Sequence, residues 1–403
     1  MKLRLAALFA FAALVAAGPA LAAPPARPAF RRSLPPVLRA LFRELPKAEL
    51  HAHLAASTPR SLVRRFMRED GLDERDIAER MTVKPRFESL GDFIQTFRRI
   101  AYLRTPDQMR RSAAAFVRQA AAENVRVVEL RERIDLGAGR AAAEASIRAI
   151  EAGLREGAAW VKARRGYDMS VGFIVSARRS DPPAESLALA KLAVSMAKRP
   201  GSLVVGFDLA GDEANHPALE HAAALRYVSR YGKPLGLGLT VHAGETPRSG
   251  DRTGVQSVWD ALRLGATRIG HANAIALDPE LMRYIKENRI LIEQAPWSNV
   301  LTRSVRDYFD HPLPRFLQAQ LDVSLSTDDR LVFKKSLTGQ LSDLYRYGLV
   351  RDWQDIRRMT LAGVHGSFTA DRAQREREVL AELARIEAVP AYRDAIAQYL
   401  SGR

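Results

Sequence analysis

The feature that most constrains the fold of this chain is a recurring alternation of short apolar runs with longer helical patterns. Runs of this kind are typical of parallel strands that are buried on both faces. The predicted helices between them lie, for example, at 106–124, 141–164, 183–198, 217–231, 253–265 and 279–288. The eight predicted strands lie at 48–54, 125–130, 169–175, 203–209, 237–241, 267–270, 290–294 and 321–325. Eight strand–helix units predict an α/β fold, a (β/α)8 barrel of the TIM type.

Two segments depart from the minimal strand–helix repeat. A long helical insertion follows the first strand, at 57–124, and a helical tail runs from about residue 352 to the end. The composition, 47% hydrophobic and 27% charged residues, supplies enough apolar material for a substantial core and excludes a disordered chain. We therefore expect one barrel domain over residues 45–403.

The first residues have the order of a secretory signal peptide. Lys2 and Arg4 precede an apolar run at 5–17, and Ala20-Leu21-Ala22 offers a small-residue cleavage site. The run is shorter than the roughly 20 residues that a membrane-spanning helix needs, so we expect no stable membrane anchor. The sequence predicts a cleavable signal peptide at 1–22, a secreted or periplasmic mature protein, and a linker rich in Pro, Arg and Ala at 23–44.

Charge and cysteine content narrow the possible partners. The formal net charge is +16, but the arginines are scattered along helices and form no basic block interleaved with aromatic residues. We therefore expect a small-molecule substrate and no specific nucleic-acid partner. The chain has no cysteine, which excludes disulfides, thiolate metal sites and a cysteine nucleophile. A metal ion would have to be held by histidine and carboxylate side chains.

Histidines and carboxylates stand where several predicted strands end. The carboxyl ends of barrel strands build one concave functional face. Side chains two apart on a strand point to the same side, so both histidines of the first strand can reach one ion. Three imidazoles and a carboxylate suit a divalent ion such as zinc. These strand-end residues are His51, His53, His242, Glu245, His271, Asp328 and Asp329.

The order of these motifs resembles the adenosine deaminase branch of the metal-dependent amidohydrolases. The segments ELHAHL, GFDLAGDE, TVHAGE, RIGHA, SNVLT and STDD carry the resemblance over about 45–369. It implies hydrolytic deamination of adenosine or a related aminopurine nucleoside, with release of ammonia. It also implies one Zn²⁺ per chain, held by His51, His53, His242 and Asp328.

The resemblance further implies how the purine is handled. Glu245, His271 and Asp329 are the expected catalytic residues, and Asp329 also contacts the imidazole part of the purine. Gly211 lacks a side chain, so its backbone N–H can approach the purine edge.

An apolar stripe on the insertion has two interpretations. Leu90, Phe93, Ile94 and Phe97 recur at helical spacing and would pack in a core. In the resembling family, a helix of this pattern lines the apolar entrance above the substrate.

Four polar residues on or beside the predicted strands could have structural roles instead of functional ones. Asp208 and Ser298 either orient metal ligands or satisfy backbone donors. We expect Glu129 and Arg131 to form a structural ion pair.

The first motif departs from the family pattern. Ala55 and Ala56 stand where the family commonly has an acid and then a glycine, and that acid holds the terminal hydroxyl of the sugar. We therefore expect a weak dependence on the ribose 5′-hydroxyl. Arg330 follows the acid pair and either faces solvent or favours an anionic substituent on the substrate.

Two other functions remain as alternatives. One is a different metal-dependent hydrolysis on the same barrel, and the other is a catalytically silent protein that binds anionic partners through its basic surface. The complete set of ligands and acid–base residues favours the enzyme. The sequence does not indicate how many subunits the protein has.

Overall fold

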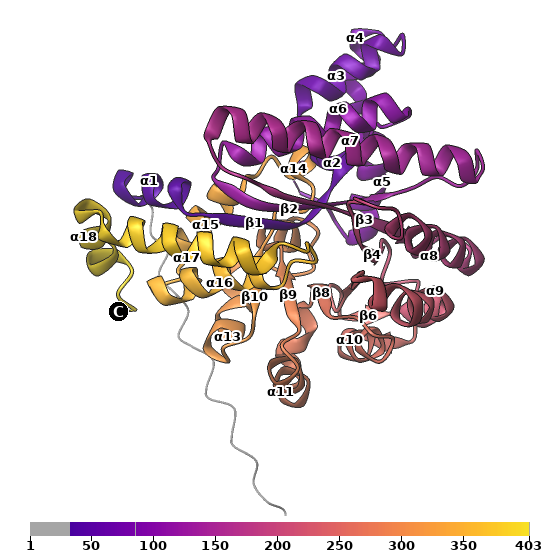
Figure 1. Ribbon diagram of the computed structural model, residues 1–403. Coiled ribbons are helices and arrows are strands. Elements are labelled where there is room, and N and C mark those ends of the chain that lie inside the picture. Colours follow the sequence, from indigo (N-terminus) through magenta and orange to yellow (C-terminus); the bar gives the residue numbers. More distant parts are fainter. Residues whose placement is uncertain (1–32, 85, 403) are drawn as a thin grey trace, which may run out of the picture.

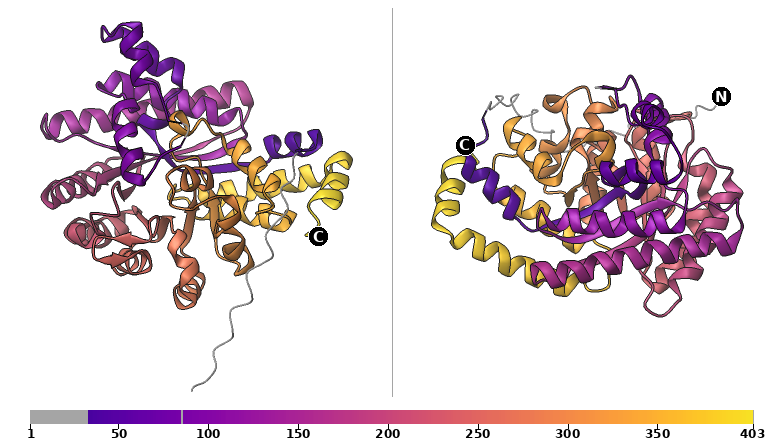
Figure 2. Two further views of the ribbon diagram at one scale, coloured as in Figure 1. Left: turned by 180° about the vertical axis from the view of Figure 1, so that it is seen from behind. Right: turned by 90° about the horizontal axis from the view of Figure 1, so that it is seen from above.

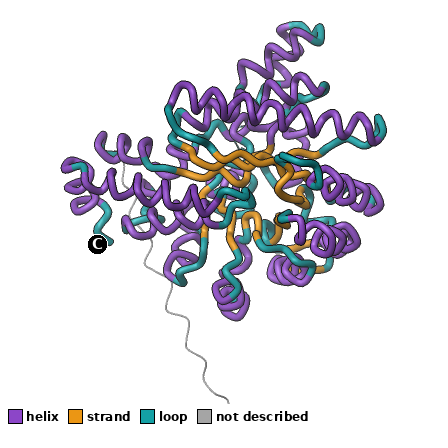
Figure 3. Tube along the Cα trace, viewed as in Figure 1, coloured by secondary structure: helices purple, strands orange, loops and turns teal. Residues whose placement is uncertain are grey.

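The computed structural model describes residues 33–84 and 86–402, and eight parallel strands form its centre (Figure 1). Each strand pairs with the next one along the sheet, so the strands follow chain order around a nearly closed barrel. Helices surround the strands on the outside (Figure 3). The barrel strands are β1 (Lys47–His53), β2 (Val125–Arg133), β3 (Ser170–Arg178), β4 (Val204–Ala210), β5 (Gly238–Ala243), β8 (Arg268–His271), β9 (Leu291–Gln294) and β10 (Val323–Leu325).

The residues after β10 close the barrel against β1. Ala52 forms a parallel bridge with Asp328. The Asp328 N–H donates to the His51 carbonyl over 3.0 Å, and the His53 N–H donates to the Asp328 carbonyl over 3.3 Å. The seam of the barrel is therefore built from the backbone of predicted functional residues.

Helices account for most of the remaining chain. Two short strands of two residues each, β6 (Arg248–Ser249) and β7 (Arg252–Thr253), form an antiparallel hairpin before α10. The longer helices begin and end at residues suited to those positions. Pro106, Pro183 and Pro279 each open a helix, where a missing N–H costs nothing. Gly166 ends the longest helix in a left-handed conformation, with φ +76°.

The helices between the strands are α6 (Pro106–Ala121), α7 (Arg140–Arg165), α8 (Pro183–Ala197), α9 (Ala222–Tyr227), α10 (Gly254–Arg263), α11 (Pro279–Glu287), α12 (Pro296–Leu301) and α13 (Leu313–Gln318), and α14 (Arg330–Phe333) and α15 (Leu337–Arg346) follow β10. The helical tail consists of α16 (Trp353–His365), α17 (Arg372–Ala388) and α18 (Pro390–Tyr399). Short 3-10 and π segments extend the region around α9, at Ala218–His221, Val228–Gly232 and Lys233–Leu235, and 3-10 turns lie at Asn273–Leu277 and Tyr308–Asp310.

The insertion after β1 forms a helical layer with a core of its own. It comprises α2 (Leu54–Ser57), α3 (Arg60–Glu69), α4 (Glu74–Arg80) and α5 (Leu90–Ile100), followed by α6. Val63, Phe66 and Ile77 are buried there together with Phe333 of α14. The insertion thereby covers the segment that follows β10.

The eight predicted strands, the insertion and the helical tail are confirmed, but the predicted linker is wrong in its second half. Residues Pro36–Glu44 form α1, whose Leu38, Leu41 and Phe42 are fully buried. This helix packs against α15 and α18, beside the helical tail (Figure 2). Its apolar residues recur every three or four positions, a period that the prolines around them obscure in the sequence.

The predicted signal peptide and the first part of the predicted linker lie outside the described residues. Among the helices of the described part of the chain, none is both long enough and apolar enough to span a bilayer.

Candidate active site

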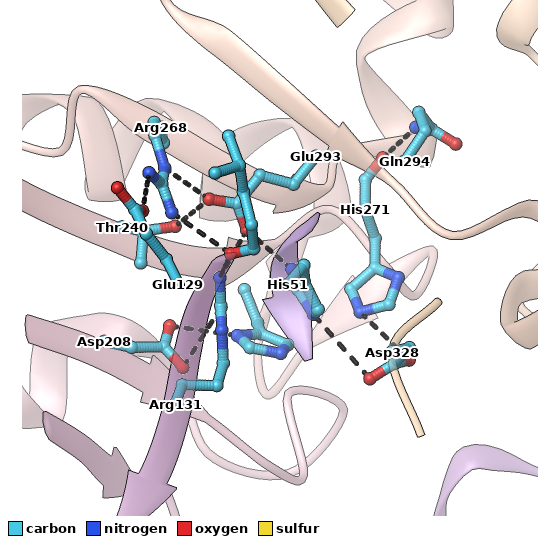
Figure 4. Close-up of polar contacts among 12 residues, drawn as sticks. His51, Glu129, Arg131, Asp208, Thr240, Arg268, His271, Glu293, Gln294 and Asp328 are labelled. Atoms are coloured by element: carbon cyan, nitrogen blue, oxygen red, sulfur yellow. Dashed lines mark hydrogen bonds and ion pairs between the residues drawn. The ribbon is translucent and has the colours of Figure 1, made fainter. Parts of the chain in front are cut away.

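The strand ends bring the predicted metal ligands close together, and Figure 4 shows two of them, His51 and Asp328, beside His271. His51, His53 and His242 form one group whose ligand atoms all lie within 4.8 Å of one another, and His51, His271 and Asp328 form another. His51, His242, His271 and Asp328 are almost completely buried, and His53 faces the opening with 14% of its side chain exposed. The predicted residues therefore surround one small space.

Two carboxylates turn the histidines toward that space. His51 Nδ1 lies 2.6 Å from Glu293, and His242 Nδ1 lies 3.0 Å from Asp208. Each ring consequently points its Nε2 inward, where the His51 Nε2 has no hydrogen-bond partner within the described structure. A buried polar atom without a partner is costly. The structure thus assigns Asp208 the orienting role that the sequence left open.

The inward atoms have the spacing of a tetrahedral site. His53 Nε2 lies 3.3 Å from His242 Nε2, and Asp328 Oδ1 lies 3.6 Å from His53 Nε2 and 3.8 Å from His51 Nε2. A tetrahedral zinc ion with ligand bonds of about 2.0–2.1 Å separates its ligand atoms by about 3.3–3.4 Å. Burial is the main cause that lowers the pKa of His53 to about 3, so this ring stays neutral as metal binding requires. The four residues fit a zinc ion.

Asp328 reaches this site through an unusual backbone conformation. Its φ is +60°, a left-handed value that is rare for residues other than glycine. The hydrogen bonds at the barrel seam hold that conformation in place, and the Ser57 hydroxyl donates to the same carbonyl over 2.9 Å. His271, with φ +61°, is also left-handed. Strained residues of this kind cluster at functional sites.

A network of buried charges fills the barrel beneath the histidines (Figure 4). Glu293 accepts hydrogen bonds from Arg131 over 2.7 Å and from Arg268 over 2.5 Å. Burial opposes its ionised form, but the two guanidinium groups outweigh burial and lower the pKa of Glu293 to about 2. Glu293 is therefore a carboxylate that holds the His51 ring.

The predicted Glu129–Arg131 pair is wrong. Arg131 instead contacts Asp208 and Glu293, whereas Glu129 pairs with Arg268. Both side chains point into the closed barrel, where charged groups from β4, β8 and β9 converge and lie closer to each of them than they lie to one another.

Glu245 and His271 face each other beside the ligand cluster. The Glu245 Oε2 lies 3.8 Å from the His271 Nε2. Burial raises the pKa of Glu245, which favours the protonated acid. His271 Nδ1 lies 2.8 Å from Oδ1 of the Asn299 side-chain amide. An amide oxygen only accepts, so Nδ1 carries the proton and Nε2 faces the site. Burial acts against a charged His271, but Glu245 and Asp328 outweigh it and raise the pKa of the ring.

Three supporting residues were not identified from the sequence. Glu213 binds the backbone N–H groups of Gly244 and Glu245 over 2.7 and 2.9 Å and fixes the loop that carries Glu245. Asn299, not its neighbour Ser298, contacts His271; the buried Ser298 hydroxyl has no partner in the described structure. Glu293 was the most detectable of the three, since it is an acid within an apolar strand.

Asp329 lies beside the metal ligands His53 and Asp328, and Gly211 has a backbone conformation that favours glycine. Asp329 is buried, and its Oδ1 has no hydrogen-bond partner among the described residues. Burial and the adjacent Asp328 raise its pKa well above the usual range, so the group is a neutral acid that can donate. Gly211 has φ +106°, a backbone conformation that would be strained in any residue with a side chain.

The predicted apolar stripe lies on α5 and divides between two environments. Leu90 and Phe93 are buried in the core of the insertion, and Phe93 stacks on Phe333 with ring centroids 5.1 Å apart. Phe97 is partly exposed, and its ring centroid lies 6.1 Å from that of His53. Ile94 is also partly exposed. The helix thus presents one edge to the site and the other to the core.

Arg330 does not face solvent, contrary to one of the two predicted interpretations. Only 9% of the residue is exposed, and its guanidinium group pairs with Glu123, at the end of the loop after α6. That ion pair anchors α14, the helix that directly follows Asp329.

The barrel, the buried histidines and the carboxylates at its strand ends define an amidohydrolase. The family model for adenosine deaminase matches residues 46–385. An adenosine deaminase of Lacticaseibacillus paracasei is 31% identical over 339 residues, which cover 82% of this chain and 93% of that protein. The chain therefore belongs to the adenosine deaminase family, and it is a hydrolytic deaminase.

Solved structures share the fold. An amidohydrolase of Burkholderia ambifaria with bound Zn superposes with a TM-score of 0.73 at 22% identity, over 92% of this chain and 98% of that one. The N6-methyl-AMP deaminase of Arabidopsis thaliana superposes with a TM-score of 0.69 at 25% identity, over 87% of this chain and 99% of that one.

Proposed function

We propose that this protein is a zinc-dependent deaminase that hydrolyses adenosine or a related aminopurine nucleoside and releases ammonia. The observation that carries the proposal is the group of His51, His53 and His242, with Asp328 3.8 Å from His51 and 3.6 Å from His53, and with Glu245 and His271 3.8 Å apart beside it. A zinc ion bound there would lower the pKa of water toward 7 and so supply a nucleophile at neutral pH.

The chain's own residues can carry the protons that the reaction moves. Hydrolysis adds water to the amino-bearing carbon, which requires the adjacent ring nitrogen to gain a proton. Glu245, whose pKa is raised by burial, supplies that proton from its carboxyl group. The Nε2 of His271 faces the same space, because Asn299 holds Nδ1, and it orients the water and accepts a proton. Cleavage of the C–N bond then releases the amino group as ammonia.

The purine is held by residues on the other side of the site. Asp329, a neutral acid with a free buried oxygen, donates to a ring nitrogen, and Gly211 lets its backbone N–H approach the purine edge. Phe97 and Ile94 cover the apolar face of the ring from α5. These side chains, together with family membership, support the proposed substrate class.

The test is an assay of ammonia release from adenine, adenosine, 2′-deoxyadenosine and AMP, with the zinc content of the purified protein measured in parallel. We expect ammonia from at least one 6-aminopurine and about one zinc ion per chain. Metal-dependent activity confined to amides or esters would contradict the proposal, and so would a metal-free protein with full activity.

A further inference from the structure

The side chain of Glu132 lies at the position where Ala55 offers no polar group. Glu132 is near the carboxyl end of β2, the strand that pairs with β1. Its Oε2 accepts a hydrogen bond of 2.7 Å from the Ala55 backbone N–H. Position 55 therefore has a carboxyl group beside it, supplied by the neighbouring strand.

This carboxyl group retains free acceptor capacity. Apart from Ala55, its hydrogen-bond partner is the Arg133 N–H, at 3.1 Å. Among the residues that the structure describes, no cationic side chain lies within ion-pair distance of Glu132. The Arg133 guanidinium points elsewhere and binds Asp181 over 2.6 Å and Glu185 over 2.5 Å. Each Glu132 oxygen can thus accept a further hydrogen bond.

Glu132 lies beside the metal-ligand end of β1. Its hydrogen bond to the Ala55 N–H places the carboxyl group against the backbone two residues after His53, whose Nε2 faces the metal site. Glu245 follows β5 and His271 ends β8, whereas β2 lies on the other side of the barrel. A purine whose amino-bearing carbon meets Glu245 and His271 consequently extends its ring substituent toward β2.

We infer that Glu132 selects the substrate by accepting a hydrogen bond from a ribose hydroxyl, and that the substrate is a neutral nucleoside and not a nucleotide. The inference rests on the proposed function and names the substrate class of the same site. A carboxylate accepts from a hydroxyl but repels a phosphate. Two arginines act on its charge: Arg133 is neutralised by Asp181 and Glu185, and Arg178 lies 3.7 Å from Asp181.

The experiment compares wild type, Glu132→Ala and Glu132→Gln in the zinc-loaded full chain at pH 8. Burial raises the pKa of Glu132 to about 7, so at this pH the group is mostly ionised. The substrates are adenosine, its 2′-, 3′- and 5′-deoxy analogues, AMP and adenine, and the readout is kcat/KM for ammonia release.

In wild type, we expect kcat/KM for one deoxy analogue to be about ten- to hundredfold lower than kcat/KM for adenosine. This is the usual effect of losing a hydrogen bond to a charged group. In Glu132→Ala, kcat/KM for adenosine should fall to within threefold of kcat/KM for that analogue. The value for the analogue itself should stay within threefold of its value in wild type, because the analogue lacks the hydroxyl that Glu132 binds. Glu132→Gln should raise kcat/KM for AMP relative to adenosine by about tenfold. Glu185→Gln, a matched loss of one acid nearby, should leave the ratio between adenosine and that analogue within twofold.

The outcomes separate this inference from the proposed function. Equal rates on all deoxy analogues in wild type, discrimination that survives Glu132→Ala, or a wild-type preference for AMP would overturn the role of Glu132 alone. Absence of ammonia from every aminopurine would overturn the proposed function, and the role of Glu132 with it.

Discussion

Asp328 and Glu245 place two carboxyl groups in the same buried site, but their surroundings give them different tasks. Asp328 lies within 4.0 Å of the Nε2 atoms of His51, His53 and His271. Glu245 lies 3.8 Å from the Nε2 of His271, and burial raises the pKa of its carboxyl group. We therefore expect the first group to hold the metal and the second to transfer a proton.

Substitution of the two residues should separate these tasks. Asp328→Ala should lose most bound zinc, because one of four ligands is removed. Glu245→Gln should keep its zinc but lose turnover by about 10²–10⁴-fold, since an amide cannot donate the proton. Zinc content measured by metal analysis, together with steady-state kinetics, checks both statements. Equal metal loss in the two variants would show that the roles are misassigned.

At this scale the sequence predicted the residues that line the site and missed Glu213, Asn299 and Glu293, which hold them. The strand-end motifs place His51, His53 and His242 in one group and His51, His271 and Asp328 in another, because the fold aligns the strand ends. Glu213 and Asn299 act through contacts with loops distant in sequence. Such contacts depend on the packing of the whole barrel, which local patterns do not encode.

At the scale of elements, an ion pair fixes the helix that follows the acid pair. Arg330 begins α14 and pairs with Glu123, which also accepts from the Thr338 N–H over 2.9 Å. The pair is almost completely buried. Removing one partner from a buried pair leaves the other charge without compensation, which typically costs about 3–5 kcal/mol.

Arg330→Met should accordingly lower the free energy of unfolding by about 3–5 kcal/mol at pH 7. Burial favours the neutral form of Glu123, but Arg330 outweighs burial and lowers the pKa of that carboxyl group. A lowered pKa gives stability that is present above the ordinary value of 4.5 and is lost as the pH falls. The difference between wild type and variant should therefore shrink between pH 7 and pH 4.

Urea unfolding at the two pH values checks this expectation, with zinc content measured in each sample because Arg330 follows the metal site closely. A difference that is independent of pH would contradict the role of the ion pair. A selective loss of kcat/KM for AMP would instead favour the other predicted role of Arg330, recognition of an anionic substituent.

Element boundaries show how far the sequence prediction reaches. All eight barrel strands were predicted to within a few residues, because buried parallel strands give continuous apolar runs. The single predicted helix at 217–231 is instead a 3-10 turn, the short helix α9 and a π segment. Apolar spacing predicts the buried face, but it does not distinguish helices of different pitch.

At the scale of the whole molecule, the first helix that the structure describes begins 14 residues after the predicted cleavage site. The helix α1 starts at Pro36, and its buried residues join the main core beside α15 and α18. Cleavage after Ala22 would therefore remove no residue of α1 or of the barrel.

We predict that the protein is exported and that its mature form begins near Ala23, outside the cytoplasm, because the charged start, apolar run and small-residue site occur in the required order. A chain that starts at Ala23 should match the full chain in thermal midpoint and activity. Deletion through Leu45 should instead destabilise the protein by several kcal/mol, since burial of a Leu or Phe contributes about 1.5–3 kcal/mol and Leu38, Leu41 and Phe42 would be lost. Mass spectrometry of the native protein and calorimetry of both truncated chains provide the measurements. Recovery of the uncleaved chain from the cytoplasm would contradict export, and equal stability of the two truncations would show that α1 is not an integral part of the barrel domain.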